Sequence, residues 1–346
     1  RERLAQVLER HRSGDGRRRR RDAGRRPLGR QGPAAPARQF RRFGGGYGNA
    51  TYEWNGTSWR NATPALASDS PSARSSHKLA WFPPLQKVVA FGGFSIGSVY
   101  YNDLWSWNGT KWTQLATAGT MPGRAEFAMA FDPNRQELVI QGGYATGGVL
   151  DGKTYTLGLV NGTPTFTDVT PGGAPSALNS HEAAYDARLG RVVLFGDWTS
   201  NKLSAWDPTA HSWTAIAPGD PEADGNPVYA GPSDAAMTFV APRGRTVYYE
   251  DNLRQTWEWN RASWAKLAPA ASPTARTSAS IGTYQSSVIL FGGSIFGSSV
   301  GDTWSWDGTN WTQLIAQTPA TRTPLQHYQT YRQDAGMVND LSGRLY

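Results

Sequence analysis

Short apolar segments separated by turn-forming residues follow one another along the chain from about residue 43 to the end. The segments Leu104–Trp107 and Thr303–Trp306 alternate apolar and polar side chains, and such segments are rich in the Trp, Tyr, Phe, Val and Thr that favour strands. Between them stand Asn-Gly and Asp-Gly pairs, as at Asn55 and Asp307, which tolerate the positive φ angles of tight hairpins. Past the first 42 residues, no segment keeps the 3.6-residue period of a helix. The pattern predicts an all-β structure with almost no helix.

Two anchors repeat along these segments. The first is an apolar strand that ends in Gly-Gly, at residues 42–45, 90–93, 140–143 and 290–293, with Gly-Asp in its place at 194–197. The second is a pair of aromatic residues around a tight turn, at Trp54/Trp59, Trp107/Trp112, Trp206/Trp213, Trp259/Trp264 and Trp306/Trp311, with Val160/Phe166 as a degenerate copy. The second members of these pairs recur every 47 to 54 residues, which is typical of propeller blades rather than of helical repeats.

Each repeat divides into four strands, which we name A to D. In the second repeat they are expected at Lys78–Phe82, Lys87–Phe91, Asp103–Trp107 and Lys111–Leu115. An isolated four-stranded sheet leaves a face and both edges exposed. Several such sheets packed face to face around a channel bury their faces and protect their edges. The sequence therefore predicts a β-propeller.

The second repeat resembles a Kelch repeat. Arg74 and His77 precede its strand A, Gly92-Gly93 follows strand B, Asn102–Trp105 opens strand C, and Trp112 and Leu115 lie in strand D. The resemblance covers 43–346 and implies a Kelch-type β-propeller with four antiparallel strands per blade, a fold shared with galactose oxidase. The copies depart from the pattern where the fourth has Gly-Asp, where the fifth has Glu250-Asp251 instead of Gly-Gly, and where the third lacks Trp.

The blade count follows from the ends of the repeat. The sequence contains six B–C–D units, and the first of them lacks its own strand A. The segment Arg322–Tyr346 begins a further unit, with a strand A expected at His327–Arg332. Either that strand closes a ring of six blades, or a seventh blade has been truncated at the C-terminus. We expect six blades here and a possible seventh in the intact protein.

Residues 1–42 differ from the rest of the chain. They hold 15 Arg and four acidic residues for a charge of +11, which leaves −3 for 43–346 out of the total of +8. With few apolar residues to bury, this tail is expected to be disordered, and it is either a basic arm or sequence read outside the native frame. Because the body lacks clustered Lys and Arg, we expect no nucleic-acid binding by the propeller.

The composition also bears on compartment and cofactors. The absence of Cys excludes disulfides and thiolate metal sites, and with them the Cys–Tyr crosslink on which the copper chemistry of galactose oxidase depends. No run of about 18 apolar residues is present, so no membrane span is expected. Few Lys and many Trp, Gly, Ser and Thr are common in exported β-proteins. We expect an extracellular or cell-surface monomer without a cofactor, and a cytoplasmic location remains open.

Arg and His recur just before strand A. The Arg residues are Arg74, Arg124, Arg276 and Arg322. In one interpretation they form a ring of cations for an anionic ligand. In the other they stabilise the structure, because each stacks on an aromatic ring or bonds carbonyl groups of the neighbouring blade. Their fixed position in each repeat favours the structural role. The equivalent residues His77, His181 and His327 belong to separate blades, and this favours separate neighbours over a shared metal site. We therefore expect no metal.

The B–C and D–A connections share one face of the predicted disc and include the long loops, where binding sites on rigid scaffolds usually lie. We predict ligand-binding residues at Phe94, Tyr100, Tyr101, Tyr144, Asp151, Trp198, Asp251 and Phe296. Aromatic rings with carboxylates suit a sugar or a peptide. We hypothesise a scaffold that binds a protein or glycan ligand. The alternatives are a carbohydrate-active enzyme (a glycosidase, lyase or epimerase), for which no catalytic residue can be named, and a structural module of a larger exported protein.

Overall fold

The computed structural model describes residues 49–171, 179, 181–196, 203–216, 235–250, 253–296 and 298–316, all of which belong to the unit Pro36–Tyr346. These residues form an all-β structure, as the sequence predicts. They contain no α-helix, and their helical turns are limited to the short 3₁₀ segments η1 (Ala67–Asp69) and η2 (Pro83–Leu85). Within this part of the chain, no helix has the length and apolar character needed to cross a bilayer.

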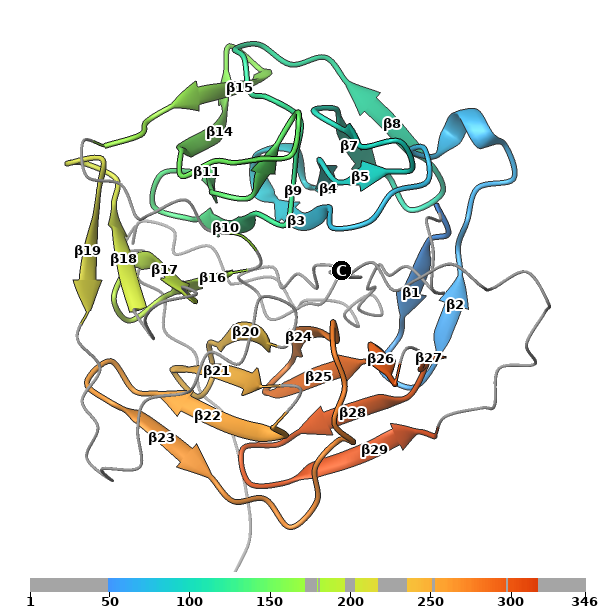
Figure 1. Ribbon diagram of the computed structural model, residues 1–346, viewed down its shortest axis with the longest axis vertical. Helices are drawn as coiled ribbons and strands as arrows, with labels where there is room; N and C mark the ends of the chain where they lie inside the picture. The colour runs from blue at the N-terminus through green and yellow to red at the C-terminus, as the bar shows by residue number, and fades with distance from the viewer. Residues whose placement is uncertain are drawn as a thin grey trace, which may run out of the picture. The chain divides into compact units, whose positions relative to one another are not determined.

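One two-stranded sheet and five four-stranded antiparallel sheets follow each other along the chain, and we number them 1 to 6 (Figure 1). Sheet 1 contains β1 (Tyr52–Trp54) and β2 (Trp59–Asn61). Sheet 2 contains β3 (Lys78–Phe82), β4 (Lys87–Phe91), β7 (Leu104–Trp107) and β8 (Trp112–Leu115). Sheet 3 contains β10 (Ala128–Asp132), β11 (Glu137–Gln141), β14 (Thr154–Val160) and β15 (Thr163–Asp168).

The other three sheets repeat this meander. Sheet 4 contains β16 (Glu182–Asp186), β17 (Arg191–Phe195), β18 (Leu203–Asp207) and β19 (Ser212–Ile216). Sheet 5 contains β20 (Ala235–Val240), β21 (Arg245–Glu250), β22 (Gln255–Trp259) and β23 (Trp264–Leu267). Sheet 6 contains β24 (Ser280–Tyr284), β25 (Ser287–Phe291), β28 (Thr303–Trp306) and β29 (Trp311–Ile315). In sheet 2, strands A and B have the predicted bounds, and strands C and D each begin one residue later than predicted.

The predicted aromatic pairs face each other across strands C and D. Their indole rings lie 5.1 to 5.5 Å apart between centroids, at Trp54/Trp59, Trp107/Trp112, Trp206/Trp213, Trp259/Trp264 and Trp306/Trp311. The assignment in the third repeat was wrong, because Phe166 lies opposite Leu157, and Val160 lies opposite Thr163. Asn161 and Gly162 both have positive φ and form a two-residue turn between Val160 and Thr163. This hairpin is therefore longer than in the other sheets, where the turn follows the aromatic pair directly or, in sheet 4, after one further residue pair.

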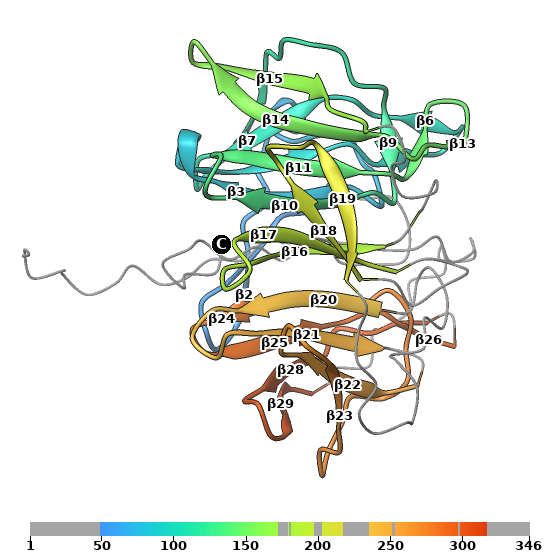
Figure 2. The same ribbon diagram turned by 90° about the vertical axis from the view of Figure 1, so that its left-hand side faces the viewer.

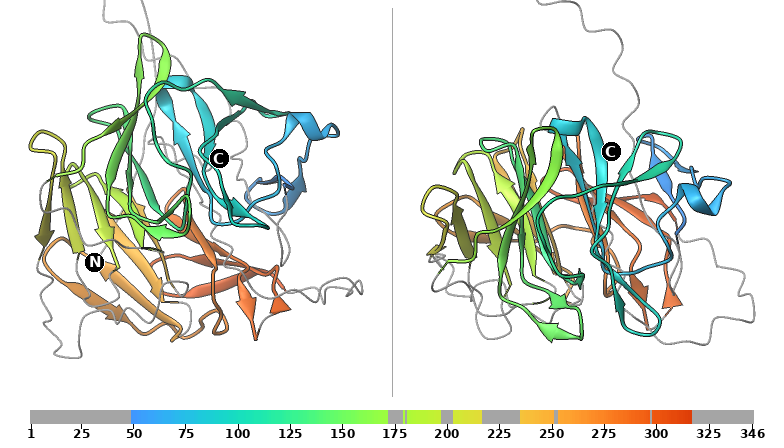
Figure 3. Two further views of the ribbon diagram at one scale, coloured as in Figure 1. Left: turned by 45° about the horizontal axis from the view of Figure 1, so that its top comes forward. Right: turned by 90° about the horizontal axis from the view of Figure 1, so that it is seen from above.

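Successive sheets contact each other through their first strands, since β3 contacts β10, β10 contacts β16, β16 contacts β20 and β20 contacts β24. Figure 1 shows these strands innermost, and Figure 3 shows the same arrangement from two further sides. A second contact recurs at the outer strands, where a Trp of strand D donates its indole N–H to a Thr at the start of strand C in the preceding sheet. The pairs are Trp112 to Thr51 (2.9 Å), Trp213 to Thr154 (2.9 Å) and Trp311 to Thr256 (2.8 Å).

Sheet 1 contacts both sheet 2 and sheet 6. Trp59 of β2 donates its indole N–H to Thr303 of β28 at 3.0 Å, which is the same Trp-to-Thr contact between the first sheet and the last. The ring of Trp59 also meets Phe291 edge-on, with centroids 4.8 Å apart. On its other side, sheet 1 supplies Thr51 to Trp112 of sheet 2. The sheets therefore contact one another in chain order, and the first also contacts the last.

Two of the six joints lack this hydrogen bond. Between sheets 2 and 3, Phe166 replaces the Trp and Leu104 replaces the Thr. Between sheets 4 and 5, Trp264 is kept but Leu203 replaces the Thr, and the buried indole N–H of Trp264 has no partner among the described residues.

The joint at Trp264 supports a prediction on stability. Trp311 is equally buried but donates to Thr256. We expect Trp311→Phe to lower the free energy of unfolding by about 1–3 kcal/mol more than Trp264→Phe does, because only the former loses a buried hydrogen bond. Urea denaturation of both variants measures the difference, and equal losses would contradict this account.

Candidate ligand-binding face

Three B–C connections fold into short hairpins, which we call the rim hairpins. They are β5 (Phe94–Ser95) with β6 (Val99–Tyr100), β12 (Tyr144–Ala145) with β13 (Val149–Leu150), and β26 (Ser294–Ile295) with β27 (Ser298–Ser299). In the second of these hairpins, β12 also pairs with β9 (Arg124–Ala125). In the first and third hairpins, single bridges Ser75–Phe94 and Thr277–Ser294 take the place of that pairing. Figure 2 shows β6, β13 and β26 at the same side of the sheets.

A buried Arg anchors the base of each rim hairpin. Arg74, Arg124 and Arg276 each donate to the carbonyl oxygen of the first Gly in their own sheet's Gly-Gly, at 3.1, 2.7 and 2.7 Å. The structural role of these three residues is thus confirmed. Arg74 and Arg124 also stack on the rings of Tyr101 and Tyr155, as predicted, but these carbonyl acceptors belong to the same repeat rather than to the neighbouring blade. The side chain reaches the Gly-Gly turn of its own sheet because strand pairing holds that turn against the segment before strand A. Arg322 lies outside the described residues.

Each of these Arg residues also forms an ion pair with the Asp that stands shortly before strand C. Arg74 contacts Asp103 at 2.5 and 2.8 Å, Arg276 contacts Asp302 at 2.6 and 2.9 Å, and Arg124 contacts Asp151 at 2.9 Å. Trp105 and Trp304 donate their indole N–H groups to the first two of these carboxylates, both at 2.7 Å.

The electrostatics of these anchors follow from burial and pairing. Burial alone would raise the pKa of Asp103, but the hydrogen bond and charge of Arg74, helped by Trp105, lower it below its ordinary value. Burial lowers the pKa of Arg124, and the charge of Asp151 opposes that change. The anchors are therefore charge-assisted hydrogen bonds that fix the hairpins to the sheets.

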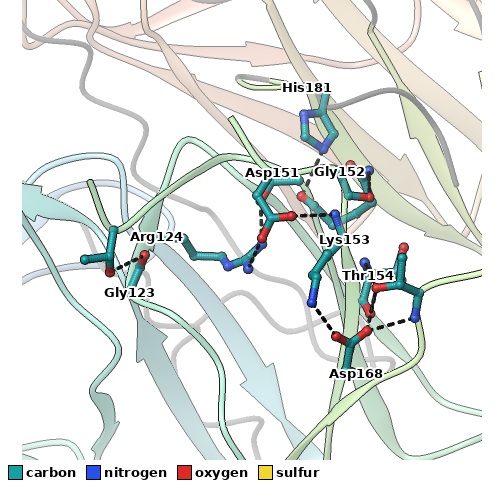
Figure 4. A network of polar contacts seen from close by, with 12 residues as sticks. Gly123, Arg124, Asp151, Gly152, Lys153, Thr154, Asp168 and His181 are labelled. Carbon is teal, nitrogen blue, oxygen red and sulfur yellow. Dashed lines mark hydrogen bonds and ion pairs between the residues drawn. The ribbon is translucent and has the colours of Figure 1, made fainter. Parts of the chain in front are cut away.

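Figure 4 shows the copy in sheet 3. Asp151 accepts hydrogen bonds from Arg124 and from the backbone N–H of Lys153, and the Lys153 ammonium binds Asp168 at 2.9 Å. His181 lies beside this network with its Nε2 3.0 Å from the carbonyl oxygen of Gln141. Within the described residues, no group of three or more His, Cys, Asp or Glu gathers that could hold a metal ion.

Two of the predicted ligand-binding residues are engaged in this anchoring. Asp151 pairs with Arg124. The ring of Tyr101 lies 3.9 Å from the Arg74 guanidinium, and its hydroxyl is 2.9 Å from the hydroxyl of Ser95. Both side chains hold the hairpins in place, so we leave them out of the candidate surface.

Three further predicted residues form the body of two rim hairpins. Phe94 and Tyr100 lie opposite each other in the rim hairpin of β5 and β6 and stack with ring centroids 5.9 Å apart. Tyr144 takes the place of Phe94 in the rim hairpin of β12 and β13, opposite Leu150 and Ala125. All three side chains are half-buried, so they offer one side to a ligand and support the hairpin with the other.

Phe296 lies at the tip of the rim hairpin of sheet 6. Its side chain is fully exposed, and its φ of 48° is a left-handed conformation that costs energy for a bulky residue. An exposed aromatic ring in such a conformation is a candidate binding residue. Trp198 and Asp251, the last two predicted residues, lie outside the described residues.

Exposed apolar side chains gather on this face. Among the described residues, eight large apolar side chains are exposed, and five of them stand in B–C connections, at Ile96, Val99, Val149, Leu253 and Phe296. The other three lie elsewhere. Leu66 belongs to a D–A connection next to Asp69, which contacts Lys111 of a C–D turn, Val160 lies at a C–D turn, and Leu314 lies on an outer strand. The sequence-based prediction missed the aliphatic residues because it searched for aromatic rings and carboxylates. The useful signal was that the hairpin segments 94–100, 144–150 and 294–300 contain no charged residue.

The chain matched none of the protein-family models against which it was scanned, and a search of curated proteins found no match.

Proposed function

We propose that residues 43–346 are a Kelch-type β-propeller with six blades, of which sheets 1 to 6 are the described parts. Four-stranded meanders that contact one another through their first strands support this proposal. The contact of Trp59 with Thr303 supports a ring of six, because it joins the first sheet to the last through the same hydrogen bond that joins neighbours elsewhere. The Arg anchors that recur in sheets 2, 3 and 6 support the likeness to the Kelch repeat.

We further propose that this protein is a binding scaffold and that the face carrying the rim hairpins binds a protein partner. The observation that carries this proposal is the gathering of five of the eight exposed large apolar side chains of the described residues on the B–C connections. Exposed apolar side chains scattered singly are ordinary, but their concentration on one face of a rigid scaffold is typical of an interaction site. The Arg–Asp anchors hold the hairpins in place beforehand, which lowers the entropic cost of binding.

The chemistry of this face favours a protein ligand over a glycan. Sugar sites combine aromatic platforms with polar groups that bind the hydroxyls. Asp103, Asp151 and Asp302 are already bound to Arg side chains, and the described hairpins carry no charge. Aliphatic tips such as Ile96 and Val149 instead fit the apolar side chains of a peptide segment.

Peptide selection on the rim face tests this proposal. A phage-displayed library of random peptides is panned on the native protein, and selected peptides are titrated against two variants. The face variant combines Ile96→Ser, Val149→Ser and Phe296→Asn, and the control combines Val160→Ser with Leu314→Ser, which are exposed apolar residues away from that face. We expect the face variant to lose at least about tenfold in affinity, or about 1.4 kcal/mol, and the control to keep its affinity. The Tm of the face variant should stay close to that of the native protein, because substitutions at exposed positions change stability little.

Two results would speak against the rim face as a protein-binding surface. One is a set of peptides that bind the face variant as tightly as the native protein. The other is a glycan-array signal that disappears in the face variant while no peptide is selected, which would favour the glycan ligand.

A further inference from the structure

The hairpin of β14 and β15 extends beyond the position at which the other sheets turn. After the pair of Leu157 and Phe166, residues 158–160 pair with residues 163–165, and the turn at Asn161-Gly162 follows. In the other sheets the turn follows this position directly or after one further pair. Figure 2 shows β13 at the other end of sheet 3 from this turn, so the extension lies on the face opposite the rim hairpins.

The extension forms one wall of a cavity of about 260 Å³, which we call the turn cavity. Residues 158–160 and Thr165 belong to this wall. The turns between strands A and B of sheets 2 and 3 contribute Pro84 and residues 135–137 on other sides. A segment that departs from a structural repeat and forms a cavity in this way is a candidate binding element.

Gly158 keeps part of this cavity open. It lies inside β14 with regular pairing to β15, and its φ is not left-handed. Apart from its chain neighbours, the described residues place one atom within 4 Å of the position that a Cβ would take, the Cβ of Glu137 at 3.8 Å. Glycine weakens a strand interior and often marks a bulge, a bend or the close approach of a backbone or a ligand. Because the register is regular and no other backbone lies close, the space at Gly158 fits the approach of a ligand.

The charges of the lining exclude an ion as the best occupant. Its charged side chains are Arg135 and Glu137, one of each sign. Burial raises the pKa of Glu137, and the hydrogen bond of Thr156 and the charge of Arg135 oppose this change. A cation in the cavity would meet the guanidinium group, and an anion would meet the carboxylate. The lining therefore favours a neutral ligand.

The lining has hydrogen-bonding capacity that the protein does not use. Arg135 donates one N–H to the hydroxyl of Thr209 at 2.5 Å, and Thr165 donates to the carbonyl oxygen of Thr163 at 3.0 Å. A guanidinium group has several N–H donors, and a hydroxyl accepts as well as donates, so both keep capacity for a ligand. The hydroxyl of Thr167 adds a further donor and acceptor. This mixture suits a ligand with several hydroxyl groups, because each of those groups also donates and accepts.

The rest of the lining is apolar, and the cavity is small. Pro84, Leu159 and Val160 offer surface for C–H groups. The volume lies below the ~300–1,000 Å³ of sites for drug-sized ligands, so the cavity accommodates a ligand of roughly one sugar ring.

We propose that the turn cavity binds a small neutral polyol of the size of a single sugar ring. Arg135 donates to its hydroxyl groups, and Glu137 accepts from them. Thr165 and Thr167 bind it from the extended hairpin, and Leu159 contacts its C–H groups. The turn cavity is separate from the rim hairpins, so this proposal does not depend on peptide binding at that face.

Saturation-transfer NMR with the full chain tests this site. The polyols are D-glucose, D-galactose, D-mannose, D-xylose and myo-inositol, and glycine and acetate serve as charged comparisons. We expect at least one of the polyols to receive saturation from the protein and to bind with a Kd in the millimolar range, because a single ring has few atoms with which to make contacts. Glycine and acetate should receive none.

The variant Gly158→Val fills the cavity from the strand. Valine favours strands, and its Cβ would meet no atom closer than 3.8 Å. We therefore expect the Tm to stay at or above that of the native protein, while the affinity for the polyol falls by at least about tenfold. Thr163→Val introduces the same side chain in the same hairpin but outside the lining, and it should change neither quantity.

Two further substitutions of similar size identify the groups that bind. Thr167→Val removes one hydroxyl from the lining and should weaken polyol binding by about threefold to tenfold. Glu137→Gln removes the negative charge and should also weaken it, because the carboxylate is the stronger acceptor. For an anionic ligand, Glu137→Gln would instead strengthen binding.

The outcomes separate the polyol from other occupants. The proposal is overturned if none of the polyols binds, or if Gly158→Val keeps the native affinity. Acetate binding that tightens in Glu137→Gln would identify an anion site, and binding of glycine alone would identify a site for a zwitterion, and either result also overturns it. If Gly158→Val fails to fold, Thr167→Val decides, because an unchanged affinity in that variant contradicts the proposal.

Discussion

Replacing Arg276 with Met is expected to lower the free energy of unfolding by about 3–5 kcal/mol, because it leaves the buried carboxylate of Asp302 without its counter-charge. In the native protein that carboxylate receives two hydrogen bonds from Arg276 and one from Trp304. The substitution also removes the donor to the carbonyl oxygen of Gly292. Equilibrium unfolding in urea measures the loss.

The matched control is the exposed ion pair between Lys153 and Asp168. Lys153→Met should cost less than about 1 kcal/mol, because water screens that pair. The double variant Arg276→Met/Asp302→Asn should recover part of the loss seen with Arg276→Met alone, since no buried charge remains. If Arg276→Met proves as mild as Lys153→Met, the Arg does not anchor the hairpin.

The second large effect concerns the Gly-Gly motif. Gly143 has a φ of +88°, and a Cβ on it would lie 2.5 Å from the carbonyl oxygen of Ala125 and 2.8 Å from the Cβ of Phe127. Neither of these atoms belongs to the flexible end of a side chain, so neither can move aside alone. We expect Gly143→Ala to destabilise the protein by at least about 4 kcal/mol, because a steric clash adds to the strained φ.

Gly147 provides the control for this prediction. Its φ of +89° is the same, but nothing lies within 4 Å of the position that a Cβ would take. Gly147→Ala should therefore cost only the strain of the backbone conformation, about 1–3 kcal/mol. Thermal and urea unfolding of the two variants separate the clash from the strain, and similar losses would show that the close approach at Gly143 is unimportant.

The strands could be predicted from the sequence because period-two alternation and Asn-Gly or Asp-Gly turns are local signals. The bounds Lys78–Phe82 and Lys87–Phe91 and five of the six aromatic pairs follow directly from them. The prediction failed at Phe166, where spacing alone suggested Val160 as its partner. Pairing depends on where the turn closes, and the closing pair Asn161-Gly162 moves the turn outward by three residues.

The candidate site was less predictable, for two physical reasons. The engagement of Asp151 with Arg124 depends on how the hairpin base meets the strand, and the exposure of Ile96 and Val149 depends on which side of a short hairpin faces the protein. Neither is fixed by residue type.

The joint between Trp59 and Thr303 has a consequence for how the chain reaches its native state. The two residues are separated by 244 positions in sequence, whereas the other Trp-to-Thr joints close over 55 to 61. Joints between neighbours can therefore form one after another while the polypeptide is still leaving the ribosome, but this one must wait until residues beyond 303 have emerged. Until then the contact between Trp59 and Phe291 cannot form. An incompletely synthesised chain therefore exposes the apolar sides of its first and last folded sheets, which a chaperone or a second nascent chain can bind.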